Sequence, residues 1–211
     1  STKTRSLKVY RSIAETACQI AEQYQLKLTY LDIGGGFFGG MVGKPQFNDY
    51  LRVLRETLSR QFSVEETTLV IEPGISLIGS PVSYVTTVMD VKETTRNHFV
   101  ITDGSRMHID PLMHKTGYFY DVKRQNAGGE MPLAKQVLCG FTCMEADRLM
   151  VVNDQLPLHT GDQILFRKVG AYTMSLAPQF IRFFPPVYLE QGGALCEVQR
   201  KWSVEDVARE F

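Results

Sequence analysis

The sequence lacks an excess of charge of either sign, and it lacks long apolar segments. Its 23 Lys and Arg residues balance 23 Asp and Glu residues, so no net field favours nucleic acid or an anionic membrane surface as a partner. The longest apolar runs, such as Leu69–Ile71 and the interrupted Phe180–Val187, fall far short of the roughly 20 residues that cross a bilayer. Neither a nucleic-acid partner nor a membrane partner is therefore expected.

Cysteine is also scarce. The four cysteines, Cys18, Cys139, Cys143 and Cys196, are too scattered for a disulfide framework, and no apolar stretch of the signal-peptide kind follows the polar N-terminal residues. A cytoplasmic location is therefore expected. The spacing of Cys139 and Cys143 is not a recognised zinc pattern, and the histidines show no grouping, so no metal site is expected.

The first 80 residues alternate between helical and strand patterns. Apolar residues recur at helical spacing between residues 9 and 24 and again between residues 47 and 62. Two short apolar stretches, 26–33 and 67–71, read as buried strands that end in glycine or in Glu-Pro-Gly. Helix, strand, helix and strand in this order predict a parallel α/β unit. Because two strands cannot close a barrel, residues 1–80 are expected to form only part of one.

From residue 82 onward the pattern changes to short strands separated by turn residues. The expected strands are Val82–Lys92, Phe99–Asp103, Gln136–Phe141, Asp162–Val169 and Ala194–Arg200. Helical character returns only at the end, where Ser203 and Asp206 fit a helix N-terminal capping pattern. Residues 81–211 are thus predicted to be a C-terminal β domain with a final short helix.

Two segments at predicted strand ends carry residues that suit an anionic, heteroaromatic ligand. Gly34–Gly36 would let backbone N–H groups approach an anion closely, since no Cβ intervenes. Glu72 ends the next strand and could keep a heteroaromatic nitrogen protonated. A tight turn and a surface carboxylate are the alternative explanations, and neither segment decides between them alone.

Two further segments lie in the predicted β domain. Cys143 follows a predicted strand, and its thiol could act as an acid in proton transfer, although a lone cysteine is more often packed in a core. Tyr172 follows another strand within Gly170-Ala171-Tyr172-Thr173, where a tyrosine usually serves packing.

Taken in order, these segments resemble the fold-type III pyridoxal-phosphate (PLP) decarboxylases, the family of the ornithine, diaminopimelate and arginine decarboxylases. The matching segments are Leu31–Phe37 (LDIGGGF), Glu72–Gly74 (EPG), Asp103-Gly104, Cys143–Asp147 (C-x3-D) and Gly170–Thr173 (GAYT). The resemblance covers nearly the whole sequence. It implies the C-terminal part of an alanine-racemase-like (β/α)8 barrel, followed by a β-sandwich or barrel-like domain.

The resemblance also implies roles for single residues. Gly34, Gly35 and Gly36 would hold the PLP phosphate, together with Gly74 and Tyr172 nearby. Glu72 would pair with the pyridine nitrogen. Cys143 would come from the partner subunit and return a proton to the substrate, so a homodimer with shared sites is implied. The implied substrate contacts are Asp110, Met144 and Asp147.

Several expected residues are absent from the sequence. The lysine that holds the cofactor covalently, and the histidine that stacks on its ring, lie in the N-terminal half of the family's barrel and match nothing here. The arginine expected after Glu-Pro-Gly is Ile75, which removes a charge-assisted phosphate contact. The acid expected after Cys143 is Met144, and the expected tyrosine of the Asp103 loop is His114. The chain is therefore expected to be the C-terminal half of an enzyme and to need an N-terminal half.

The favoured function is the PLP-dependent decarboxylation of a small-molecule or carrier-attached amino acid. A binding or regulatory relative that has lost the cofactor is the alternative from another class, and Ile75 and Met144 favour it. A racemase of the same barrel type is a third reading, which Glu72 argues against.

Overall fold

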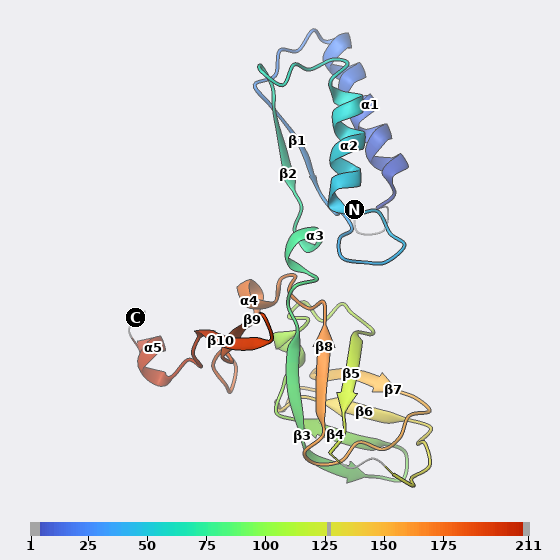
Figure 1. Cartoon of the computed structure of the whole chain (residues 1–211), viewed down its shortest axis with the longest axis vertical. Coiled ribbons are helices and arrows are strands. Elements are labelled where there is room, and N and C mark those ends of the chain that lie inside the picture. The colour runs from blue at the N-terminus through green and yellow to red at the C-terminus, as the bar shows by residue number, and fades with distance from the viewer. Residues whose placement is uncertain (1–4, 126–127, 209–211) are drawn as a thin grey trace.

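A computed structural model describes residues 5–125 and 128–208. Figure 1 shows two packed regions at opposite ends of the long axis, one with two helices beside two strands and one with a curled, mostly antiparallel sheet in which β4 (His98–Thr102) and β6 (Gln136–Cys139) pair in parallel. The first region contains α1 (Leu7–Gln23), β1 (Tyr30–Gly35), α2 (Phe47–Leu58) and β2 (Thr68–Glu72). A single turn of helix, α3 (Ile75–Ile78), connects the two regions.

The predicted order of helix, strand, helix and strand is observed, and β1 and β2 pair in parallel from Tyr30 opposite Thr68 to Gly35 opposite Glu72. The prediction placed the first strand too early, at residue 26. The chain instead turns through Gln25, whose φ of 49° is left-handed, and enters the strand only at Tyr30. Aromatic and aliphatic side chains between the helices and the strands form the core, namely Tyr10, Ala14, Phe37, Tyr50, Leu54 and Leu58.

The strand pair is covered on one side only. Both helices lie on the same side of β1 and β2 (Figure 1), and β2 is exposed at every residue except the half-buried Ile71. Tyr30 is 67% exposed, and Leu69 and Val70 are also exposed. Parallel strands in folded domains are normally buried on both faces, so this unit presents apolar surface that further chain could cover.

The second region is built on a six-stranded sheet in the order β5-β8-β3-β4-β6-β7. These strands are β3 (Tyr84–Glu93), β4 (His98–Thr102), β5 (Phe119–Lys123), β6 (Gln136–Cys139), β7 (Arg148–Val152) and β8 (Gln163–Arg167). The long strand β3 pairs with β8 through its first half and with β4 through its second, which curls the sheet around one core. Apolar residues of that core include Val88, Val100, Leu138, Ile164 and Phe166.

Shorter elements complete the chain: η1 (Arg106–His108), α4 (Thr173–Leu176), β9 (Val187–Gln191), β10 (Ala194–Gln199) and α5 (Val204–Ala208). The predicted start of the last helix is observed, because the Asp206 carboxylate accepts a hydrogen bond from the Ser203 backbone N–H at 2.7 Å. Strands β5, β7 and β9 were not predicted. Of the helices in the described ranges, none has the length and apolar character needed to cross a bilayer.

Candidate active site

The glycine loop lies where β1 ends beside the end of β2. Gly34 and Gly36 have φ angles of 72° and 91°, which favour glycine. A Cβ on Gly35 would lie 2.1 Å from the carbonyl oxygen of Glu72, so only glycine allows the two strand ends to approach this closely. The Tyr10 hydroxyl donates to the Gly35 carbonyl at 2.6 Å and fixes the loop to α1.

Glu72 and Gly74 lie at the same edge. The Glu72 side chain is exposed, and Gly74, with a φ of 46°, starts α3. Among the described residues, and apart from the two chain neighbours of Gly34, no atom lies within 4 Å of the position that a Cβ on Gly34 would take, so a group can approach the loop there. This open glycine backbone and the exposed carboxylate of Glu72 fit the two polar ends of PLP, its phosphate and its pyridine nitrogen. Ile75, half-buried in α3, adds no charge.

Tyr172 lies in a segment that makes a close contact with the end of α3. The Gly170 N–H donates to the Gly79 carbonyl at 3.1 Å, and a Cβ on Gly170 would lie 2.0 Å from the Ile78 carbonyl oxygen. Tyr172 has a left-handed φ of 65° and an exposed side chain. Its predicted place near a cofactor phosphate stays a prediction.

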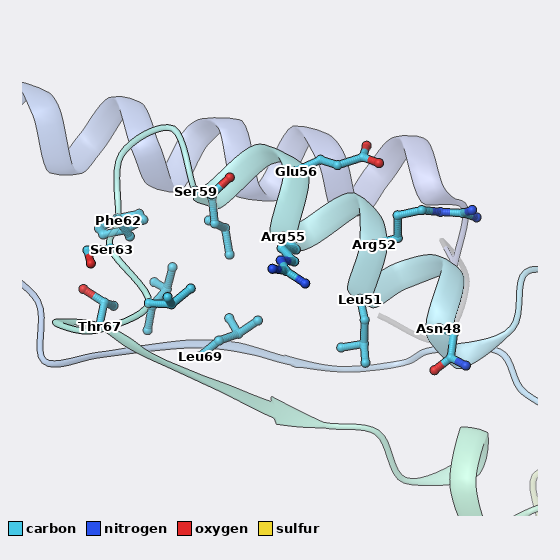
Figure 2. Close-up of a pocket in the computed structure, with 13 residues that line it drawn as sticks. Asn48, Leu51, Arg52, Arg55, Glu56, Ser59, Phe62, Ser63, Thr67 and Leu69 are labelled. Atoms are coloured by element: carbon cyan, nitrogen blue, oxygen red, sulfur yellow. The ribbon is translucent and has the colours of Figure 1, made fainter.

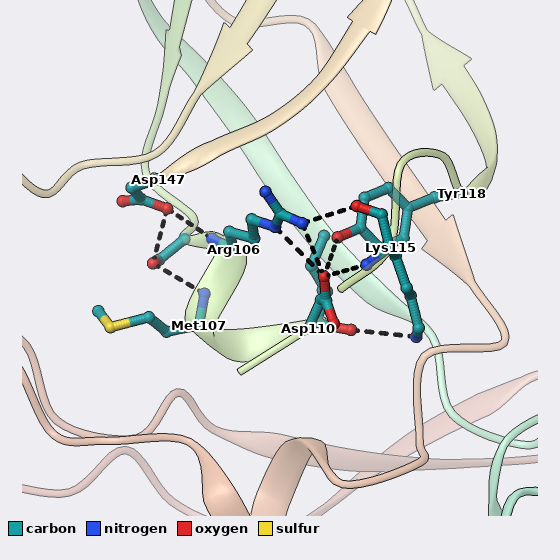
Figure 3. Close-up of polar contacts among 8 residues, drawn as sticks. Arg106, Met107, Asp110, Lys115, Tyr118 and Asp147 are labelled. Atoms are coloured by element: carbon teal, nitrogen blue, oxygen red, sulfur yellow. Dashed lines mark hydrogen bonds and ion pairs between the residues drawn. The ribbon is translucent and has the colours of Figure 1, made fainter. Parts of the chain in front are cut away.

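The Cys143 loop is organised around the carboxylate of Asp147. This carboxylate is buried and accepts hydrogen bonds from the Ser105 hydroxyl at 2.9 Å and the Arg106 N–H at 2.7 Å (Figure 3). It also accepts from the N–H and the hydroxyl of Thr142, at 3.1 and 2.7 Å. Asp147 therefore holds the loop in shape. Cys143 is exposed at the surface of the loop, and the predicted substrate contact by Asp147 remains untested.

Asp110 is likewise committed to neighbouring groups. One of its oxygens accepts from the Arg106 guanidinium at 3.2 and 3.0 Å, from the Lys115 N–H at 2.8 Å and from the Tyr118 hydroxyl at 3.3 Å (Figure 3). Burial, and then Asp110, raise the pKa of Tyr118, so its hydroxyl keeps its proton. A substrate ammonium group would have to compete with Arg106 for this carboxylate.

Four side chains that the sequence analysis did not assign to the site lie beside the Cys143 loop. The Tyr84 hydroxyl lies 2.9 Å from Nδ1 of His108, and the His108 ring lies 5.9 Å from the Phe141 ring. The guanidinium of Arg182 stacks over the Phe141 ring, with its Cζ 4.4 Å from the ring centroid. Burial lowers the pKa of His108. These residues carry no motif, and only the fold brings them together.

The predicted site residues thus fall into two groups. Gly34–Gly36, Glu72 and Gly74 lie at the strand ends that lead into α3, and the segment of Tyr172 contacts the end of α3. Cys143, Met144, Asp147 and Asp110 instead lie in and around the Cys143 loop (the thiol loop). No hydrogen bond or ion pair connects the two groups within residues 5–125 and 128–208.

A separate apolar groove runs beside α2. It has a volume of about 690 Å³ and lies between α2 and the two strands (Figure 2). Its apolar lining consists of Leu31, Leu51, Leu58, Phe62, Val64 and Leu69. None of the predicted site residues lines this groove. Because its lining is largely apolar, we interpret the groove as a packing surface.

Comparison with known proteins identifies a family model that matches the first region and relatives that align over most of the chain. Residues 4–79 match the family described as the pyridoxal binding domain of pyridoxal-dependent decarboxylases. A probable chloroplastic diaminopimelate decarboxylase of Oryza sativa subsp. japonica is 29% identical, with 88% of this chain and 38% of that protein aligned. Antizyme inhibitor 2 of Xenopus laevis is 27% identical over 82% of this chain and 41% of that protein.

Another relative is the L-glutamyl-[BtrI acyl-carrier protein] decarboxylase of Niallia circulans, 27% identical over 89% of this chain and 47% of that protein. The fold resembles a crystal structure of diaminopimelate decarboxylase with a TM-score of 0.78 at 20% identity, covering 97% of this chain and 52% of that one. The chain thus spans about half the length of these proteins or less.

Proposed function

We propose that this chain forms the C-terminal part of a PLP-dependent amino acid decarboxylase. The observation that carries the proposal is the juxtaposition of the glycine loop with Glu72, at paired strand ends of a region that matches a pyridoxal-binding domain. Parallel strands place their ligand sites at their carboxyl ends. The four free cysteines agree with a cytoplasmic location, which is part of the proposal.

PLP, when bound, accepts the electron pair that remains at Cα after CO2 departs. The backbone at Gly34–Gly36 would hold its phosphate, with the Gly34 N–H already donating to the Asp32 carboxylate at 2.8 Å. The Glu72 carboxylate would accept a hydrogen bond from the pyridine N–H and would so hold the proton on that nitrogen. The exposed thiol of Cys143 then donates its proton to Cα, and Asp147 keeps the loop that carries this thiol in shape.

A further segment is needed to complete the site. The uncovered strand pair, the apolar groove beside α2, and exposed apolar side chains on the β9–β10 hairpin, among them Tyr188, Leu189 and Leu195, all provide surface for it. We infer that this segment is the N-terminal half of the barrel and that it supplies the lysine that binds the cofactor. Cys143 and Glu72 belong to separate groups of residues within this chain. A homodimer with shared sites, in which Cys143 of one subunit faces Glu72 of the other, would bring them together.

The substrate we propose is an amino acid without a free distal ammonium group, either as a small molecule or attached to a carrier. Met144 stands where an acid is expected, and Asp110 is already paired with Arg106. The relative whose name specifies an L-glutamyl group on an acyl-carrier protein supports a carrier-attached substrate.

A binding or regulatory protein is the second candidate. Ile75 and Met144 remove charges that the decarboxylases use, and a relative of this chain is an antizyme inhibitor. This alternative predicts that the assembled protein neither retains PLP nor releases CO2.

Borohydride reduction in the presence of PLP, followed by peptide mapping, tests the proposal. The chain combined with its N-terminal half should carry one label per site, on a lysine of the added half, and should release CO2 from at least one amino acid. Stoichiometric labelling of a single lysine within this chain would overturn the assignment of the halves. Absence of both label and CO2 release would favour the binding protein.

A further inference from the structure

Arg182 projects a guanidinium group over the segment that leads to Cys143. Its Cζ lies 4.4 Å from the centre of the Phe141 ring, and its Nη1 donates to the Asp103 carbonyl at 3.0 Å. Phe141 is tied to the same loop, because its N–H donates to the Gly104 carbonyl at 2.9 Å. The Phe141 ring and the Asp103 carbonyl thus both hold the guanidinium of Arg182. Phe141 lies two residues before Cys143, the proposed proton donor.

No carboxylate forms an ion pair with Arg182 in the part of the chain that the structure describes. The nearby acids serve other partners. Asp103 accepts from the Thr86 hydroxyl and the Thr87 N–H at 2.6 and 2.7 Å, while Asp147 holds the thiol loop. An arginine has five N–H donors, and the structure records only one hydrogen bond from Arg182.

The positive charge of Arg182 also acts on its buried neighbours. It lowers the pKa of His108, after the larger effect of burial. The thiol loop thus has a cation beside it, and the uncharged Met144 follows Cys143 directly. A distal ammonium group would meet repulsion here, and an oxyanion would meet attraction.

We propose that Arg182 is a specificity-determining residue that binds an oxyanion at the distal end of the substrate. The inference rests on the proposed decarboxylase function, because it places the substrate next to Cys143. A carboxylate or a phosphate oxyanion satisfies the planar donor fork of arginine. The oxyanion is either the side-chain carboxylate of a free amino acid or the phosphate of a carrier arm.

The holoenzyme, assembled with its N-terminal half, provides the test. Glutamate and its neutral isostere glutamine form one substrate pair. Glutamyl thioesters of pantetheine with and without the 4′-phosphate form the other. Arg182→Gln should lower kcat/KM for the anionic member of one pair by about 10–100-fold and change the neutral member less than about threefold. Arg182→Lys should keep part of the preference. The pair that responds identifies the source of the oxyanion.

Equal losses for anionic and neutral members, or a wild-type preference for lysine or ornithine, would overturn the inference. If no amino acid is decarboxylated, the proposed function fails separately, and calorimetric titration with glutarate and glutaramate still decides the role of Arg182. Tighter binding of glutarate that disappears in Arg182→Gln would support it, and equal affinities would contradict it. Because Arg182 is exposed, both variants should melt as the wild type does.

Discussion

At the scale of single residues, the thiol of Cys143 is the side chain whose role is most directly testable. The thiol is exposed on a loop whose shape is fixed by hydrogen bonds to the Asp147 carboxylate. We expect Cys143→Ala to leave PLP binding intact and to lower turnover by roughly 10²–10⁴-fold, the usual contribution of a positioned acid. Steady-state CO2 release and the absorbance of bound cofactor measure the two effects.

A subunit-mixing control extends this test. If each site draws on two subunits, mixing Cys143→Ala with a variant that lacks the cofactor-binding lysine should restore part of the activity. The exposed Cys196, which lies in β10, offers a matched control, and Cys196→Ala should leave turnover unchanged. Unchanged turnover in Cys143→Ala would assign this thiol to packing.

His108 provides a pH-dependent test at the same scale. Burial lowers the pKa of His108 in the folded state, with the charge of Asp147 opposing and that of Arg182 adding to the effect. Between its lowered folded pKa and its unfolded pKa of about 6.5, the folded chain binds fewer protons than the unfolded chain. The free energy of unfolding should therefore fall as the pH decreases below about 6.5.

His108→Gln should flatten this dependence, since an amide does not titrate yet can still hydrogen-bond to Tyr84. Urea unfolding of the assembled protein at pH 5, 6 and 7 measures the slope. The exposed His114 is the control, and His114→Gln should keep the wild-type slope. A slope unchanged in His108→Gln would remove His108 as its source.

The sequence was most informative about residues whose position follows from strand direction. Gly35 and Glu72 end neighbouring parallel strands, so their proximity could be expected, although their role in binding a cofactor stays a prediction. The sequence could not show that the Asp147 carboxylate points into its own loop. That orientation depends on hydrogen-bond donors from Ser105 and Arg106, which lie about 40 residues earlier in the chain. Arg182 was missed since its contacts arise only from the fold.

At the scale of elements, the contact of Gly170 with α3 fixes the position of the segment that carries Tyr172. A methyl group at Gly170 would lie 2.0 Å from the Ile78 carbonyl oxygen and 2.8 Å from the Val82 side chain. We expect Gly170→Ala to lower the free energy of unfolding by about 1–3 kcal/mol, as overpacking does. It should also weaken PLP binding, because the shifted segment carries Tyr172.

Gly117 is the matched control for this substitution. Beyond its two chain neighbours, no atom in the part of the chain that the structure describes lies within 4 Å of its Cβ position, so Gly117→Ala should change stability by less than about 0.5 kcal/mol. Thermal melting and equilibrium binding of PLP measure both variants. A Gly170→Ala protein that melts and binds PLP like the wild type would show that the segment can move away from α3 at no cost.

The strands that were predicted and those that were missed differ in what specifies them. β3 and β8 are long or strongly apolar and could be recognised locally. β5 has only five residues and carries the aromatic Phe119 on its exposed face, and its place at the sheet edge is set by its pairing with β8, with Tyr120 opposite Phe166. β9 could have been found, because Gly192 and Gly193, both with positive φ, form the two-residue turn typical of a hairpin.

At the scale of the whole molecule, the groove beside α2 and the uncovered strand pair define where the N-terminal half should pack. Leu69 lies in β2, is 36% exposed and lines the groove. We expect Leu69→Asp to lower the affinity for a separately expressed N-terminal half by at least about tenfold, because it places a charge in an apolar contact. Met131, also exposed but in the loop before β6, supplies the control Met131→Asp, which should bind like the wild type. Sedimentation equilibrium of mixed halves measures the affinity, and equal binding of both variants would place the partner on another surface.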